Sequence, residues 1–390
     1  GMSYEAVAQV NPLIVHATCP GWGEEGPLAD LPFHDGQSQA FCGFASLNGD
    51  AGGKPELFRH SYPLDLITSI FFSSTVLLGL IARERTGEGQ RVRSSHLASS
   101  FNGLISRIPE YWATDRVPIP MGSASVSTAP HQTFLCLDKR YIAVGVETPE
   151  QWGGLCQALK REDLKDDSRF ATNGDRVAHR EELAGILQET FLAKPSRWWA
   201  IQLDKNGVPY GYLYDFETLR NHAQVLENRF IELVDVPHQG QVYMGGIPWR
   251  FSKTPASMYA APSPGQHTEE ILAQGFKAFG DGASRSDKAG NGSALGRLVE
   301  GQPPLTGLKV VEATQGLCGP YAGLLLAEAG AQVIKVEPPA GDHARQFAPG
   351  LGGAESAVFV MLNRNKEGVT LDTGTEKGRQ GLLELLKDAD

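Results

Sequence analysis

Asp65 is the side chain in this sequence whose type and position most favour chemistry. It directly precedes residues 66–81, where apolar side chains recur at helical spacing. A carboxylate at that point accepts hydrogen bonds from the first-turn amides and is stabilised by the helix dipole. A plain helix cap is the common role of such a residue. The alternative is a carboxylate nucleophile, which attacks a carbonyl carbon in a site shielded from water.

His34 and Asp35 form a second candidate, because an imidazole beside a carboxylate is a combination used in acid and base catalysis. They follow a loop and precede the small-residue stretch 37–47. Adjacent side chains of an extended segment point in opposite directions, so a solvated or helix-capping pair is the competing interpretation. We therefore rank His34 after Asp65 as a catalytic candidate.

Residues 313–320 form a glycine-containing turn between a predicted strand and a predicted helix. The pattern partly matches a dinucleotide-binding fingerprint, with Glu337 standing where a ribose-binding acid would be. Because the turn has only Gly316 and Gly319, the GxGxxG pattern is not met and we expect no NAD. A helix N-terminus that faces a phosphate of another ligand fits the same turn.

Basic residues near this turn offer another route to phosphate binding. Arg345 and the segment 363–366 lie toward the same edge of the predicted sheet, where cations can hold a phosphorylated nucleotide. A solvated turn is the alternative for residues 363–366. We include Arg345 among the predicted ligand-binding residues. The histidines and cysteines lack the spacing of a metal site, so no metal is expected.

The elements that must position these residues follow from hydrophobic periodicity. Residues 66–81 predict a helix with basic residues in its last turn and a glycine stop at Gly87. Residues 13–17 predict a buried strand that leads into the glycine-rich loop 20–27. Strand followed by loop is where α/β enzymes place ligands.

The last part of the chain predicts a βαβ unit, with a strand at 308–311, a helix at 321–329 and a strand at 333–336. Such a unit opens a parallel sheet. The helix predicted at 377–386 should feed a further strand, which the sequence does not contain.

Changes of pattern divide the chain into parts and predict an α/β fold. The predicted parts are residues 1–120 with Asp65, a smaller α/β domain at 121–245, a segment at 246–279, a linker at 280–304 and a part at 305–390 that opens with the βαβ unit. The linker is predicted because 280–304 is rich in glycine, serine and charge and poor in apolar residues.

Composition excludes several classes of function. The 390 residues carry a net charge of -10, which argues against binding to nucleic acid. Five cysteines without a CxxC pair fit a reducing compartment. The start lacks the features of a signal peptide, and no stretch approaches the length of a membrane span. We expect a cytoplasmic protein that binds no membrane, with Gly1 left over from a tag.

Several stretches carry the motifs of one known family. Within residues 3–275 they are Asn11-Pro12-Leu13-Ile14, Gly21-Trp22-Gly23, Gly26-Pro27, the Asp65 helix closing in Thr86-Gly87-Glu88-Gly89-Gln90, Gly207-Val208-Pro209, Phe251-Ser252-Lys253-Thr254-Pro255 and Pro264-Gly265-Gln266-His267-Thr268. Within residues 305–390 they are Leu308-Lys309-Val310-Val311, Gly319-Pro320-Tyr321-Ala322, the run from Gly330 to Pro339, Gly341-Asp342, Arg345, Asn363-Arg364-Asn365-Lys366 and Leu371-Asp372. In this combination the chain resembles the family III CoA-transferases, also called the CaiB/BaiF family.

The order of these motifs is inverted, because residues 305–390 resemble the opening of the family and residues 3–275 resemble its later part. The segment that should join Asp390 to Ser3, with one strand and a turn, is absent. We expect a fragment of a tandem fusion of two family copies, joined at 280–304. A natural rearrangement is the alternative.

The resemblance implies a doubly wound parallel-sheet large domain with a smaller α/β domain, and two copies interlocked as a homodimer or a tandem-copy pseudo-dimer. It implies that Asp65 is the catalytic aspartate, which moves CoA from an acyl-CoA thioester to a carboxylic acid through aspartyl anhydride and thioester intermediates. Coenzyme A, as acyl-CoA, is then the expected ligand.

The resemblance also implies which residues contact CoA. By position they are Gly21, Trp22, Gly23, Leu317, Cys318, Leu371, Asp372 and Thr373. The chain departs from the family at Pro20 and Pro338, where members often have Arg or Lys.

Two other activities stay open. An α-methylacyl-CoA racemase would use His34 and Asp65 as its acid and base pair, although Glu147 stands one residue from the expected third group. A non-catalytic CoA-binding half of a fused transferase or lyase would use Asp65 only as a helix cap.

Overall fold

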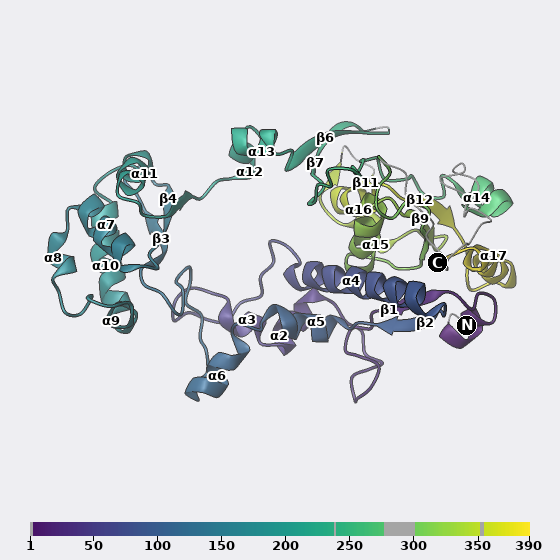
Figure 1. The fold of residues 1–390 in the computed structure, drawn as a ribbon, viewed down its shortest axis with the longest axis horizontal. Coiled ribbons are helices and arrows are strands. Elements are labelled where there is room, and N and C mark those ends of the chain that lie inside the picture. Colours follow the sequence, from purple (N-terminus) through teal and green to yellow (C-terminus); the bar gives the residue numbers. More distant parts are fainter. Residues whose placement is uncertain (1–2, 238, 277–300, 352–354) are drawn as a thin grey trace. The chain divides into compact units, whose positions relative to one another are not determined.

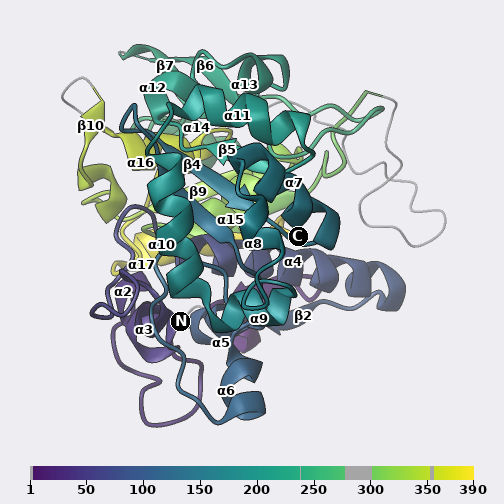
Figure 2. The same cartoon turned by 90° about the vertical axis from the view of Figure 1, so that its left-hand side faces the viewer.

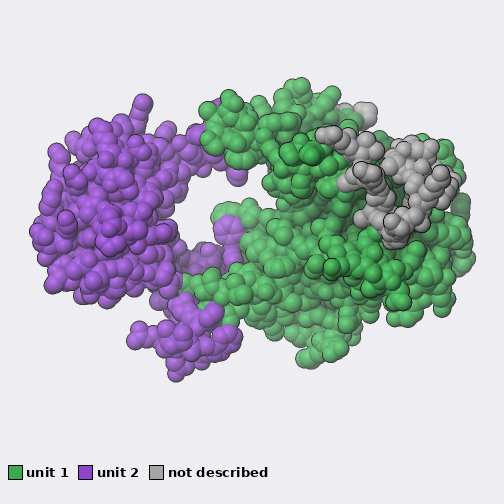
Figure 3. Space-filling model, viewed as in Figure 1, with its two compact units in different colours: residues 1–42, 59–108, 223–390 green, residues 43–58, 109–222 purple. Residues whose placement is uncertain are grey.

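The computed structural model describes residues 3–237, 239–276, 301–351 and 355–390. Contacts within the chain divide it into two units, which Figure 3 colours separately. Unit 1 contains residues 1–42, 59–108 and 223–390, and unit 2 contains residues 43–58 and 109–222. Most of the predicted linker, up to residue 300, lies outside the described residues.

Parallel strands form the centre of unit 1. One sheet has the order β12-β9-β8, and β1 pairs with β2 in a second sheet. The strands are β1 (Val15–Thr18), β2 (Gln90–Arg93), β8 (Lys309–Glu312), β9 (Gln332–Glu337) and β12 (Glu367–Thr370). The predicted strands at 13–17, 308–311 and 333–336 are confirmed within a residue or two.

Helices cover both faces of the β8-β9-β12 sheet, as a doubly wound fold requires. Val310 and Val333 face a core shared with α4 and α15, whereas Val311 and Ile334 face a core shared with α1 and α17. These helices are α1 (Tyr4–Ala8), α4 (Pro63–Thr86), α15 (Cys318–Glu328) and α17 (Glu376–Lys387). Figures 1 and 2 show α4 lying alongside α15. The predicted doubly wound α/β fold is confirmed.

A groove of about 200 Å³ separates β8 from β1, with α4 and α15 lining it. Asp390 lies at its end, where its carbonyl oxygen accepts a hydrogen bond from Val15 N (2.7 Å) and its amide donates to Lys309 O (2.8 Å). Asp390 also pairs with Arg83 at 3.2 Å.

The helix predicted at 66–81 is confirmed as α4, which ends at Gly87 in the left-handed conformation. It has 24 residues and a mean hydropathy of 1.9 in its most apolar window, so the prediction that no stretch approaches the length of a membrane span was wrong. Its buried face is rich in small and polar side chains, including Asp65, Ser69 and Ser73. Its opposite face exposes the large apolar side chains Ile70, Phe71, Leu78 and Ile81.

The remaining elements of unit 1 surround this sheet. They are α2 (Asp35–Phe41), α5 (His96–Gly103), α13 (Ala223–Glu227), β6 (Ile231–Val236), β7 (Gly240–Gly245), α14 (Thr268–Gln274), the 3-10 helix η2 (His343–Gln346), β10 (Gly350–Leu351), β11 (Glu355–Ser356) and α16 (Ala357–Asn363). Val236 and Met244 of the β6–β7 hairpin pack against Phe359 and Val360. Because of this packing the hairpin belongs to unit 1, whereas we predicted residues up to 245 in the smaller domain.

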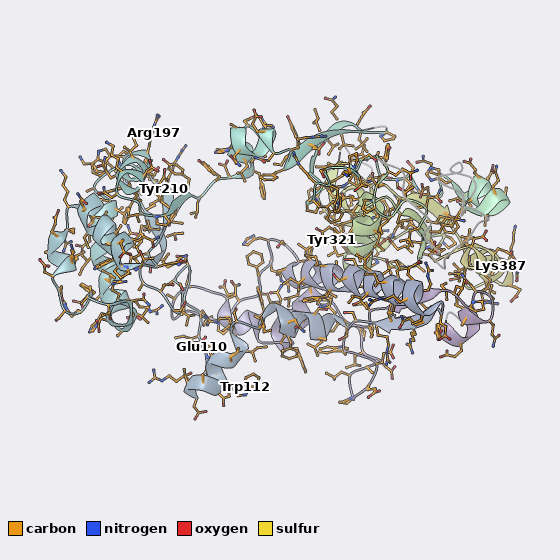
Figure 4. All side chains as sticks on the ribbon, viewed as in Figure 1. Glu110, Trp112, Arg197, Tyr210, Tyr321 and Lys387 are labelled. Atoms are coloured by element: carbon orange, nitrogen blue, oxygen red, sulfur yellow. The ribbon has the colours of Figure 1, made fainter. Side chains whose placement is uncertain are left out.

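Unit 2 is a smaller α/β body whose antiparallel sheet has the order β3-β4-β5. Its elements are α3 (Phe44–Leu47), α6 (Ile108–Thr114), β3 (His131–Leu135), β4 (Tyr141–Gly145), α7 (Pro149–Leu159), α8 (Glu162–Lys165), α9 (Asn173–Ala178), α10 (Arg180–Phe191), α11 (Ser196–Lys205), β5 (Tyr210–Tyr212) and α12 (Phe216–Leu219). Phe134, Phe191 and Trp199 form part of its own core. Trp112 projects from α6 and is 75% exposed (Figure 4).

Candidate active site

Asp65 lines a cavity of about 770 Å³ in unit 1. Residues of the loop after β1, of the α2 region and of α4 form part of the wall, and the loop 313–319 after β8 forms another part. Because β8 is parallel to β9, this loop lies at the carboxyl edge of the sheet, where α/β folds bind their ligands. The cavity therefore brings together two parts of the chain that are far apart in sequence.

The first turn of α4 is capped by the side chain of Asp35. Its Oδ2 accepts hydrogen bonds from Leu64 N (3.0 Å) and Asp65 N (3.2 Å). These amides lack partners within the helix, so the Asp35 carboxylate satisfies them and favours the positive end of the helix dipole. Asp65 is therefore not the cap of its own helix, and its carboxylate is left for another role.

His96 holds that carboxylate in place. His96 Nε2 lies 2.8 Å from Asp65 Oδ1, and the histidine is only 5% exposed. The other ring nitrogen, Nδ1, lies 3.3 Å from Ser100 Oγ, which contacts Ser38 Oγ at 2.6 Å. No described residue hydrogen-bonds to Asp65 Oδ2. One carboxylate oxygen is therefore fixed, and the other is available to a molecule in the cavity.

The loop after β1 positions His96. The carbonyl oxygens of Pro20 and Gly21 accept hydrogen bonds from the amides of His96 and Leu97, both at 3.0 Å. A Cβ on Gly21 would lie 2.2 Å from Phe33 Cβ, so only glycine fits this approach. Phe33 in turn packs edge-on against the His96 ring, with 4.8 Å between ring centroids.

Ser69 joins α4 to the N-terminus of α15. Its hydroxyl lies 2.7 Å from both Asp65 O and Cys318 O. The thiols of Cys19 and Cys318 also contact each other next to the start of α15. Their hydrogen bond lowers the pKa of Cys19 and raises the pKa of Cys318. These contacts hold Asp65 next to the first residues of α15.

A network of buried, paired charges hydrogen-bonds to the backbone of the loop 313–319. Lys335 pairs with Glu312 (3.1 Å) and Asp342 (2.9 Å) and donates to Thr314 O (3.0 Å). Asp342 Oδ1 accepts a hydrogen bond from Gly316 N at 2.9 Å. Burial acts to raise the pKa of Asp342, but the attraction of Lys335 and the hydrogen bonds to the carboxylate together lower it. Because each charge is paired, the network tolerates burial and fixes the loop that faces Asp65.

A family model described as CoA-transferase family III matches residues 1–268 and 305–390. The chain belongs to CoA-transferase family III. This match confirms the resemblance that the sequence motifs carry in both parts of the chain.

Curated relatives in this family are named as CoA-transferases. Succinyl-CoA:glutarate CoA-transferase of Mus musculus is 30% identical over 275 residues, which cover 70% of this chain and 62% of the mouse protein. Succinate--glutarate CoA-transferase of Agrobacterium fabrum is 30% identical over 278 residues, which cover 70% of this chain and 68% of that protein. The chain thus spans less than two thirds of the mouse relative.

A solved structure of a CaiB/BaiF family protein from Brucella suis matches with a TM-score of 0.60 at 28% identity. The match covers 70% of each chain. It supports the same family fold for the α/β architecture described above.

Five of the predicted site residues of this family member lie in one cavity. They are Gly21, His34, Asp65, Leu317 and Cys318. His34 is exposed and is the residue before α2. The imidazole that contacts Asp65 belongs to His96 instead. The roles of these residues toward CoA and substrate stay predictions.

The other predicted CoA-contacting residues are not among those that line this cavity. The Trp22 ring packs edge-on against Phe33, and Gly23 follows it in the left-handed region. Arg345 pairs with Glu337 (2.7 Å) and Glu355 (3.0 Å), so its charge is already matched within the protein.

Leu371, Asp372 and Thr373 follow β12 at the carboxyl edge of the sheet. The Leu371 side chain is buried in the core next to α17, and the other two are exposed. Among the residues that the structure describes, no group of three or more acidic, histidine or cysteine side chains has the arrangement of a metal site.

Segment 363–366 matches neither of its two predicted roles. Arg364 Nε donates to Glu328 Oε1 at 2.8 Å, and Lys366 pairs with Glu312 at 2.8 Å. Both basic residues are buried, with 4% of their surface exposed. Lys366 therefore belongs to the ion network and Arg364 pairs separately with Glu328, so neither cation is left in a solvated turn or for a nucleotide.

Sequence reasoning missed His96, Asp35 as the cap of α4, and Arg59 in the cavity wall. His96 is separated from Asp65 by 31 residues, and no spacing rule connects them. Serine at position 95, which caps α5, predicts a helix start but not which side chain that helix places in the cavity.

Proposed function

We propose that this chain transfers CoA from an acyl-CoA thioester to a carboxylic acid through covalent intermediates on Asp65. The observation that carries the proposal is the position of the Asp65 carboxylate. It lines the cavity, is held through Oδ1 by His96, and leaves Oδ2 without a described partner. The names of the curated relatives support CoA transfer to small acids.

The first half of the reaction forms an aspartyl thioester. Asp65 Oδ2 attacks the thioester carbonyl, the C–S bond breaks, and a mixed anhydride and CoA thiolate result. The thiolate then attacks the Asp65 carbonyl carbon. This step releases the donor as a free carboxylate and leaves CoA on Asp65.

The second half reverses these steps with the acceptor. The acceptor carboxylate attacks the Asp65 thioester and forms a second anhydride with release of the thiolate. Attack of the thiolate on the acceptor carbonyl then gives the new acyl-CoA and restores the Asp65 carboxylate.

Charge that develops on the carbonyl oxygens needs donors that are fixed in advance. The first residues of α15, Cys318 and Gly319, line the cavity, and α15 has 11 residues. The amides at the start of such a helix are free donors, and the helix dipole favours negative charge there. We assign the stabilisation of the anhydride oxyanions to this helix end.

The exposed apolar face of α4 is a candidate interface with a second copy of the chain. Leu78 is 66% exposed and Ile81 is 54% exposed, on the face opposite Asp65. Large apolar side chains grouped on one helix face are typical of interaction surfaces. We propose that this face is covered in an interlocked homodimer or a tandem-copy pseudo-dimer.

The test of the proposed function is CoA transfer from succinyl-CoA to glutarate by the Asp65→Asn and Asp65→Ala variants. We expect loss of more than about 1,000-fold in kcat with unchanged circular dichroism, as for removal of a covalent nucleophile. Undiminished turnover in both variants would contradict the proposal. Proton exchange at the α-carbon of an acyl-CoA in deuterated water, without CoA transfer, would favour a racemase.

A further inference from the structure

Arg59 is the one Arg or Lys among the described residues that line the cavity with Asp65. It is exposed, and no ion pair or hydrogen bond to another described residue engages its guanidinium group. Other basic groups nearby are engaged. Arg91 and Arg93 both pair with Glu24, which lines the same cavity. Arg59 is therefore a cation that no described carboxylate pairs with, in a cavity of about 770 Å³.

The absence of a side chain at Gly36 leaves space for the Arg59 guanidinium group. A Cβ on Gly36 would lie 3.1 Å from Arg59 Nη1, 3.4 Å from Nη2 and 3.4 Å from His34 Cε1. The Arg59 guanidinium and the His34 imidazole thus both lie next to Gly36, in the space that a side chain at this position would occupy. A larger residue at position 36 would push them apart.

The residue that precedes Gly36 contacts the first turn of α4, which carries Asp65. Asp35, which precedes Gly36, accepts the hydrogen bond from the Asp65 amide at 3.2 Å. Arg59 and Asp65 therefore contact two consecutive residues of the same cavity wall. Both residues line the same cavity, so a ligand bound there faces the Arg59 guanidinium as well as the Asp65 carboxylate.

We propose that Arg59 binds the distal carboxylate of a dicarboxylic acid whose reacting carboxyl group lies at Asp65. The inference rests on the proposed function and names the class of acid that the site takes. The planar guanidinium fork matches a carboxylate through two parallel hydrogen bonds. A phosphate of CoA is the less suitable partner, because the pantetheine arm separates the phosphates from the thioester that must reach Asp65.

The test compares glutarate with valerate as acceptors, because these acids share a five-carbon chain and differ in the distal carboxylate. Butyryl-CoA is the donor, so that only the acceptor carries a second carboxylate. The variants are Arg59→Gln, Arg59→Lys and, as a matched control, Arg85→Gln. Arg85 is an exposed residue of α4 that does not line the cavity.

We expect the full chain to prefer glutarate and Arg59→Gln to lower the ratio of kcat/KM for glutarate over valerate by roughly 10- to 100-fold, the range for a lost hydrogen bond to a charged group. Arg59→Lys should retain part of the preference, since it keeps the charge but loses the fork. Arg85→Gln should leave the ratio unchanged.

Two results overturn the inference alone. One is equal activity of the unmodified chain with the two acids. The other is an equal loss with both acids in Arg59→Gln together with a raised KM for butyryl-CoA, which assigns Arg59 to a CoA phosphate. Absence of transfer to either acid by the unmodified chain, from butyryl-CoA and from succinyl-CoA, overturns the proposed function itself and the inference with it.

Discussion

Asp65 and His96 are joined by one hydrogen bond, in which the histidine orients the carboxylate. His96 Nε2 lies 2.8 Å from Oδ1, so the imidazole orients the carboxylate without occupying Oδ2. The ring is itself oriented by Ser100 and by the edge of Phe33. In the proposed mechanism His96 is thus a positioning residue, which acts through Asp65.

We predict that His96→Phe lowers kcat by roughly 10- to 100-fold while KM for acyl-CoA stays within about twofold, because a misplaced nucleophile affects the chemical step more than binding. His96→Gln, which can still donate to Oδ1, should recover part of the rate. Steady-state kinetics of both variants check this, with His131→Phe in unit 2 as the control. An unchanged kcat in His96→Phe would remove the histidine from the mechanism.

Glu367 gives a pH dependence to the stability of unit 1. Its Oε2 is buried without a hydrogen-bond partner, and burial raises the pKa of this carboxyl from 4.5 to about 7. Between these values the folded chain binds more protons than the unfolded chain. Stability contributed by this group therefore falls as pH rises from 4.5 to about 7.

We predict that Glu367→Gln removes this decline. Relative to the variant, the unmodified chain should lose stability between about pH 4.5 and about pH 7. Urea denaturation across that range measures the difference, with exposed Glu269→Gln as the control. Parallel stability curves for the unmodified chain and Glu367→Gln would show that Glu367 titrates in the same range in both states.

Elements were more predictable than the contacts between them. The helices α4, α15 and α17 differ from their predicted ranges by a few residues at their ends. Periodicity is a local signal, so it identifies an element without its partners. The ion pairs of Arg364 and Lys366 could not be predicted in this way, because their partners Glu328 and Glu312 come from elements that are distant in sequence.

Helix α15 packs closely on the buried ion network through Gly323. A Cβ on Gly323 would lie 1.9 Å from Glu312 Oε2, and Glu312 holds both Lys335 and Lys366. The small residue at this helix position therefore leaves room for a buried carboxylate. The cavity loop 313–319 depends on the network that this carboxylate completes.

We predict that Gly323→Ala lowers the free energy of unfolding by about 3 kcal/mol, as expected when a buried ion pair is broken. Gly381→Ala in α17 is the matched control, because a Cβ there would lie 3.4 Å from side-chain carbons of Leu272 and Leu371. It should raise stability by up to about 1 kcal/mol through helix propensity. Equal effects of the two substitutions in urea denaturation would contradict the proposed role of the network.

At the scale of the whole molecule, the sequence motifs predicted the family and the α/β fold class, because several of them coincide with elements such as β8 and the start of α15. The division into units was less predictable. Residues 43–58 join unit 2, and the β6–β7 hairpin joins unit 1. Such assignments depend on packing between segments distant in sequence, which composition does not reveal.

The exposed face of α4 predicts self-association. Replacing both Leu78 and Ile81 by Glu places charges on the proposed interface, where burial without partners is unfavourable. Light scattering coupled to size-exclusion chromatography should give a lower mass for this double variant than for the unmodified chain. Leu272→Glu on α14 is the control. An unmodified chain that is already monomeric would exclude the homodimer.

Covalent chemistry at Asp65 can be observed by mass spectrometry of the chain incubated with acyl-CoA and digested at low pH. We predict a CoA adduct on the peptide that contains Asp65, sensitive to hydroxylamine and absent in Asp65→Asn. Transfer of CoA without an adduct at Asp65, or an adduct on another residue, would contradict the assignment of Asp65 as the nucleophile.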